Sequence, residues 1–103
     1  ITQAVCNSFK QELLQGLHDL DGHTLKLALY TSSATLGPTT TAFSTTNESS
    51  GTNYTSGGAT IANVAVSLSG TVAFVDFDDV TFSSATISDA AGALIYNNSF
   101  NKD

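Results

Sequence analysis

The sequence has no tryptophan, methionine or arginine, and it has one cysteine, Cys6, and one proline, Pro38. Its three basic residues are all lysines and face nine acids, which gives a net charge of −6. Three scattered lysines cannot form the positive surface that binds phosphate backbones or anionic lipids, so we expect neither a nucleic-acid nor a membrane partner. One cysteine excludes an internal disulfide and any site built from several cysteines.

Charge of either sign is scarce, and hydroxyl groups take its place. Charged residues make up 12% of the chain, about half of the ~25% that is typical. Serine and threonine together fill 28 of the 103 positions. No segment approaches the roughly 18 apolar residues of a membrane span, and no basic stretch followed by an apolar one indicates a signal peptide. The length predicts a single domain over 1–103.

The first part of the chain predicts a helix over 2–21. Apolar residues recur there at steps of four and three: Val5, Phe9, Leu13, Leu17 and Leu20. This spacing is that of one stripe on a helix. Thr2 can accept a hydrogen bond as the N-cap residue, and Gly22 suits a left-handed C-terminal cap. On this prediction Gly16 lies inside the helix, at a cost of about 1 kcal/mol relative to alanine.

The remainder predicts β structure over 24–31 and 59–97. Apolar and polar residues alternate in 24–31, as in a half-buried strand. Within the second region we expect strands over 61–68, 71–77, 80–87 and 93–96. Ser69-Gly70 predicts a tight turn between the first two of these strands. We expect the helix to pack on Leu25, Leu27 and Leu29, which gives an α+β fold with an N-terminal helix on an antiparallel β-sheet or small β-sandwich.

A long Ser/Thr-rich arm separates the two β regions, over 32–58. A loop of this length inside one compact domain is uncommon and is usually either functional or disordered. Either it packs as an extended arm on its own domain or on a neighbour, or it is a solvated loop with a few residues tucked beneath it. Four residues are candidate anchors for an intersubunit contact: Leu36, Pro38, Phe43 and Tyr54. Glu48 is the one charged residue in 32–56, so little charge would be desolvated on docking.

Cys6, His18 and His23 are the residues that could form a thiol–imidazole pair. On a helix over 2–21, Cys6 and His18 would be about 18 Å apart, so they are not expected to touch. We interpret Cys6 as a small core residue. The two histidines are interpreted as neighbours of the helix C-terminus, where a protonated imidazole interacts favourably with the helix dipole.

The acidic residues do not form a recognisable site either. Asp76, Asp78 and Asp79 cluster, but the spacing, central glycine and closing glutamate of a calcium-binding loop are missing. Asp76 and Asp89 could face each other as a glycosidase pair, but nothing selects them. Three Asn-x-Ser/Thr sequences, at 47–49, 53–55 and 97–99, match the glycosylation pattern, as expected by chance in so hydroxyl-rich a chain. We expect no catalytic, cofactor-binding or metal-binding residues and a non-enzymatic protein.

Four segments carry a resemblance to a known family. They are ITQAVCNSFKQELL (1–14), LKLALYTSSATL (25–36), TNESSGTNYTSGG (46–58) and GALIYN (92–97). In this order they resemble a family of small structural proteins of tailed-bacteriophage virions. The resemblance implies a virion component rather than an enzyme.

Among virion roles, the small size, acidic charge and β-rich pattern of the chain favour a capsid decoration (cement) protein on the outside of the major capsid shell. Its partners would be the major capsid protein and copies of itself, as a homo-oligomer on the virion. The alternative is a tail component, such as a tube, adaptor or fibre-associated subunit. A glycan-binding module and an enzyme are further alternatives, but the first would need exposed aromatic residues, and the chain has no tryptophan and three tyrosines.

Overall fold

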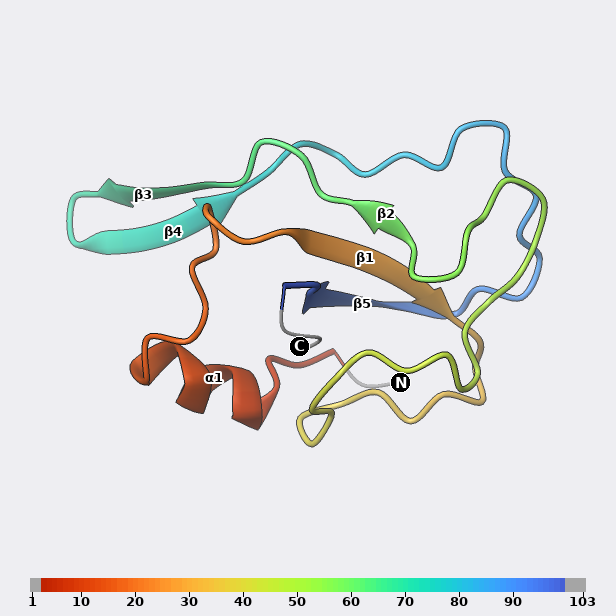
Figure 1. Ribbon diagram of the computed structural model, residues 1–103, viewed down its shortest axis with the longest axis horizontal. Coiled ribbons are helices and arrows are strands. Elements are labelled where there is room, and N and C mark those ends of the chain that lie inside the picture. Colours follow the sequence, from red (N-terminus) through yellow and green to blue (C-terminus); the bar gives the residue numbers. More distant parts are fainter. Residues whose placement is uncertain (1–2, 100–103) are drawn as a thin grey trace.

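One short helix precedes five strands in the computed structural model, which describes residues 3–99 (Figure 1). The elements are α1 (Asn7–Leu14), β1 (Leu25–Tyr30), β2 (Ala59–Thr60), β3 (Ala65–Ser69), β4 (Val72–Asp76) and β5 (Gly92–Asn97). The strands form two antiparallel sheets, one of three strands in the order β2-β1-β5 and one of two strands, β3-β4. With the helix lying beside the larger sheet, the fold is α+β, as expected.

β1 organises the larger sheet. It pairs with β5 along its whole length, from Leu25 opposite Asn97 to Tyr30 opposite Gly92. On its other edge it pairs only briefly with β2. The strand expected within 24–31 and the strand expected over 93–96 are therefore confirmed. The turn expected at Ser69-Gly70 is confirmed as well, because Ser69 pairs with Val72 and leaves Gly70 and Thr71 as a two-residue turn.

The core lies on one face of the β1–β5 pair. Its buried residues are Ala28, Tyr30, Ala34, Leu94 and Tyr96. Leu36 and Phe43 of the arm pack against this cluster. The expectation that Leu25, Leu27 and Leu29 form the core face is wrong for Leu27 and Leu29, which are only half-buried. The reason is that the arm covers the opposite face of β1, where it buries Tyr30 almost completely.

The helix is shorter than the sequence predicts. It ends at Leu14 because Gly16 adopts a left-handed φ of 73°. Its N–H donates to the carbonyl of Leu13 at 3.1 Å, and the N–H of Leu17 donates to that of Glu12 at 2.9 Å. These paired bonds are a glycine-capped helix end. Gly16 is thus the cap rather than an interior residue, and the cap expected at Gly22 is wrong.

The burial expected for the helix is also wrong. Val5 is 59% exposed and Leu13 is 40% exposed, whereas Glu12 is buried. The early end of the helix explains this, because the chain turns back after Gly16 and brings His18 against Glu12. The helix therefore buries the side chain of Glu12 in place of an apolar one. The N-cap expected at Thr2 lies outside the described residues.

The fourth expected strand does not form. In 80–87 the structure has no strand, and a single bridge joins Thr86 to Thr52, with both backbone hydrogen bonds at 3.0 Å. Near this bridge the side chain of Asn53, which belongs to the arm, donates to the carbonyl of Ser84 at 3.0 Å.

Candidate functional site

Glu48 holds the arm through three hydrogen bonds. Its Oε2 accepts from the Tyr54 hydroxyl at 2.7 Å and from the Gly57 N–H at 2.8 Å, and its Oε1 accepts from the Ser56 hydroxyl at 2.8 Å. The Tyr54 oxygen in turn accepts from the N–H of Leu29 in β1 at 3.0 Å. The segment TNESSGTNYTSGG is therefore a clamp that ties the arm to the sheet.

Aromatic residues of the core fasten the arm at further points. The Tyr30 hydroxyl donates to the carbonyl of Ser44 at 2.6 Å, and the Tyr96 hydroxyl donates to that of Gly57 at 2.7 Å. The ring of Phe43 stacks on that of Tyr96 at a centroid distance of 4.6 Å. An aromatic pair at this distance adds about 1 kcal/mol beyond the area it buries.

The tyrosine pKa values reflect this packing. Burial, followed by the hydrogen bond to Glu48, raises the pKa of Tyr54 well above its ordinary value. Burial also raises the pKa of Tyr30 and of Tyr96, and the nearby Glu48 carboxylate adds to both shifts. The folded protein therefore holds all three hydroxyls in their neutral, hydrogen-bonding form.

The arm also forms hydrogen bonds with the start of the helix. The N–H of Asn7 donates to the carbonyl of Pro38 at 2.8 Å, the Ser8 hydroxyl donates to that of Thr40 at 3.3 Å, and the Cys6 thiol lies 3.7 Å from that of Gly37. The residue at the N-cap position, Cys6, makes no side-chain capping bond. The carbonyl of Pro38 therefore satisfies one of the four free N–H groups at the start of the helix.

These contacts locate the four residues proposed for an intersubunit contact. Leu36 and Phe43 pack on the core, and Tyr54 is half-buried beside Glu48, so all three already have partners within the chain. Pro38 is exposed, while its carbonyl serves the helix. Of the alternatives open from sequence, the arm packs on its own domain. A contact between arm and neighbour stays a prediction, and it would have to use the outward side of the arm.

A cleft of about 320 Å³ lies between the arm and the core, where Tyr30 and Ala34 are among the residues that line it. Hydroxyl and amide side chains line much of it: Thr35, Thr39, Thr40, Thr41, Ser44, Thr46 and Asn47. None of the lining residues is charged. Such a surface can exchange hydrogen bonds with water for bonds to a partner without desolvating charge.

A buried polar network joins the helix to β5. The Nε2 of His18 lies 2.9 Å from Oε1 of Glu12, and its Nδ1 lies 3.0 Å from Nδ2 of Asn97. The same Asn97 nitrogen lies 3.0 Å from Nδ1 of His23, and the Asn97 oxygen accepts from the N–H of Ser99. The histidines therefore hold β5 to the end of the helix, and the interpretation that they face a helix C-terminus near residue 21 is wrong.

The other polar residues singled out from sequence make local contacts. Cys6 and His18 do not lie on one helix over 2–21, because the helix ends at Leu14. Asp78 accepts from the Asn63 amide at 2.6 Å, and Asp76 accepts from the N–H of Phe77. Within 3–99, no group of three or more His, Cys, Asp or Glu side chains is placed to hold a metal ion.

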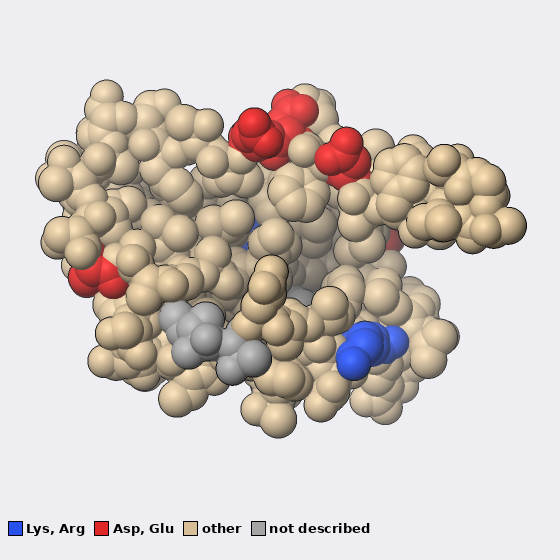
Figure 2. Space-filling view, turned by 180° about the vertical axis from the view of Figure 1, so that it is seen from behind, with Lys and Arg blue, Asp and Glu red and all other residues tan. Residues whose placement is uncertain are grey.

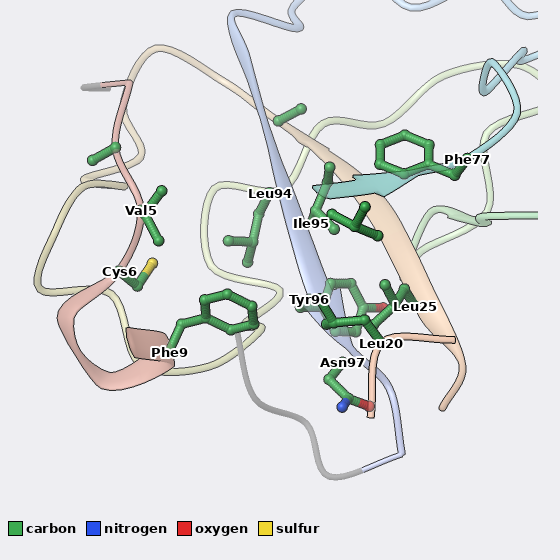
Figure 3. A pocket seen from close by; sticks show the side chains of 13 residues that line it. Val5, Cys6, Phe9, Leu20, Leu25, Phe77, Leu94, Ile95, Tyr96 and Asn97 are labelled. Atoms are coloured by element: carbon green, nitrogen blue, oxygen red, sulfur yellow. The ribbon is translucent and has the colours of Figure 1, made fainter. Parts of the chain in front are cut away.

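An apolar groove lies between the helix side of the molecule and β5 (Figure 3). Its volume is about 340 Å³. Val5 and Phe9 approach it from the N-terminal segment, Ile95 from β5, and Phe77 from the end of β4. No lining residue is charged. No pattern in the sequence indicates this groove, since its walls come from segments that only the fold brings together.

The β3–β4 hairpin projects from the body of the molecule (Figure 1). Every residue of both strands is exposed. Five large apolar side chains are among them: Val66, Leu68, Val72, Phe74 and Val75. Figure 2 shows the projection as an uncharged extension, with acidic side chains gathered near its base. The hairpin is the second feature, beside the groove, that has apolar surface without a partner in the chain.

Comparison with protein-family models, curated proteins and solved structures finds no match for this chain. None of the helices formed by residues 3–99 has the length and apolar character needed to cross a bilayer. The function therefore has to be inferred from the surfaces described above and from the sequence resemblance.

Proposed function

We propose that this chain is a non-enzymatic structural protein of a tailed-bacteriophage virion and that it decorates the outside of the major capsid shell. The observation that carries the proposal is its exposed apolar surface. Seven of the nine exposed large apolar side chains described belong to the hairpin or to the groove, where Val5 and Ile95 lie. Contiguous apolar surface of this kind is typical of a protein built to contact other proteins.

The net charge and the residue types of the chain support a position on the outside of a capsid shell. A net charge of −6 disfavours contact with packaged nucleic acid. The hydroxyl-lined cleft of the arm offers uncharged hydrogen-bonding groups to a capsid subunit. The partners would be the major capsid protein and further copies of this chain.

The test is to find the protein in purified virions. Quantitative mass spectrometry gives its copy number relative to the major capsid protein, and cryo-electron microscopy gives its position. A decoration protein is expected in high copy number on the outer capsid surface. Low copy number with density confined to the tail would replace this function with the alternative of a tail component. Absence of the protein from purified virions would refute both.

A further inference from the structure

The β3–β4 hairpin lacks the contacts that normally stabilise a β-ribbon. Within the described residues, its strands contact each other and no other helix or strand. A two-stranded hairpin alone is marginal in water. Both outer edges are unpaired, and residues 64–75 contain no charge and no proline, which are the usual means of protecting an edge strand. This composition is typical of a strand pair whose surface is covered by a partner.

Its two faces differ. The strand register places Val66 opposite Val75 and Leu68 opposite Ala73, so these four residues share one wholly apolar face. The other face carries two serines, Asp76 and three apolar residues, Ala65, Val72 and Phe74. Val75 of the apolar face also lines the groove, as does Phe77 beyond it. The apolar face and the groove are thus one continuous surface.

The chain exposes more surface than a compact monomer of its mass. The chain exposes 6267 Å², whereas a compact monomer of this mass exposes about 5,500 Å². Its radius of gyration is 14.1 Å, against about 13 Å for a compact domain of this length. The excess area, roughly 800 Å², is close to what each partner contributes to a standard interface.

The charge distribution indicates which partner fits. A second copy carries the same net charge of −6, so association through a charged face would be opposed by repulsion. The hairpin face and the groove are free of charge, and the hairpin projects from the body whereas the groove is concave. From these observations we propose that two copies of this chain pair about a two-fold axis, with the apolar face of each hairpin covering the groove of the other.

This pairing goes beyond the proposed virion function and is tested on the isolated chain. Sedimentation velocity should show a dimer at about 100 µM, well above the micromolar limit for interfaces of standard size. Leu68→Glu on the hairpin and Ile95→Glu at the groove should each weaken the dimer at least ~10-fold, because each buries an unpaired charge. Ser67→Glu is the matched control, since it adds the same charge on the opposite face of β3.

A mixing experiment separates a lost contact from a lost fold. Leu68→Lys and Ile95→Asp should each be monomeric alone, and together they should form a mixed dimer, because the introduced charges face each other. Misfolded variants could not recover in this way. A wild-type chain that stays monomeric at the highest concentration would overturn the proposal. So would a dimer unaffected by Leu68→Glu and Ile95→Glu, or one disrupted equally by Ser67→Glu. None of these results depends on where the protein lies in a virion.

Discussion

Glu48 is the residue whose role changes most between sequence and structure. In sequence it is the lone acid of a hydroxyl-rich arm, notable for how little charge would be desolvated on docking. In the structure its carboxylate accepts hydrogen bonds from Tyr54, Ser56 and Gly57 and so closes the arm on the sheet. A charge placed among neutral donors is stabilising here because every bond it makes is charge-assisted.

Glu48→Gln should lower the free energy of unfolding by about 2 kcal/mol, since one acceptor oxygen becomes an amide donor and a charge-assisted bond is lost. Urea unfolding measures the change. Asp89→Asn removes the same charge at an exposed position and should shift the free energy by less than about 0.5 kcal/mol. Equal losses in the two variants would show that net charge, and not the clamp, is responsible.

At the scale of elements, the helix shows how one backbone conformation overrides a side-chain pattern. The apolar stripe continues past Leu14, but the left-handed φ of Gly16 ends the helix there. The turn that follows delivers His18 to Glu12 and to Asn97 of β5. The position of the helix beside the sheet therefore depends on the glycine cap as much as on apolar contact.

Gly16→Ala should destabilise the protein by about 1 kcal/mol, the cost of placing a Cβ at a positive φ. The site is open, with nothing within 4 Å of an added Cβ, so the loss should come from backbone strain alone. Thermal or urea unfolding gives the value. Gln15→Ala, one residue earlier and in right-handed conformation, is the control and should be nearly neutral. A Gly16→Ala variant as stable as this control would rule out the cap.

The arm, as an element, should be protected in the isolated protein. The Ser49 N–H donates to the carbonyl of Leu29 at 2.9 Å and the Gly57 N–H to Glu48, so both amides should exchange with deuterium more slowly than in an unfolded reference. Exchange measured by NMR on free and virion-bound protein tests this. If these amides exchange freely until the protein binds a virion, the arm orders on a neighbour instead.

For the whole molecule, the structure distributes its apolar residues unevenly. A small core around Tyr30 and Tyr96 supports the body, while the hairpin and the groove leave much apolar surface exposed. The three tyrosines link this core to the arm through their hydroxyls. Global stability should therefore depend on the protonation of these hydroxyls.

Stability should fall steeply in alkali. Because folding raises the pKa of Tyr30, Tyr54 and Tyr96, the unfolded chain loses these protons first. Their contribution is fully present below the unfolded pKa of about 10 and is lost as the pH rises above it. Tyrosinate absorbance and circular dichroism should change together in one transition. Tyr54→Phe should make the loss shallower, and ionisation of all three tyrosines without unfolding would contradict the coupling.

The sequence by itself determined the elements whose signals are local. Alternation located β1, the strands expected over 61–68 and 71–77 overlap β3 and β4, and Ser69-Gly70 located their turn, because pleat and turn geometry act over a few residues. The helix was predicted in the right place but too long, because the spacing of apolar residues does not reveal the backbone φ of Gly16.

Only the tertiary structure decided what depends on distant segments. Which face of β1 is buried follows from the arm lying over Tyr30, and the strand expected over 80–87 is lost where Thr52 and Thr86 make a single bridge. The role of Glu48 could have been suspected from its spacing to Tyr54 and Gly57, but its bonds required the fold. The groove and the hairpin face became one surface because Val75 and Ile95, twenty residues apart in sequence, line the same groove once β4 and β5 are in place. Side-chain patterns record local geometry, whereas burial and docking surfaces are properties of the packed chain.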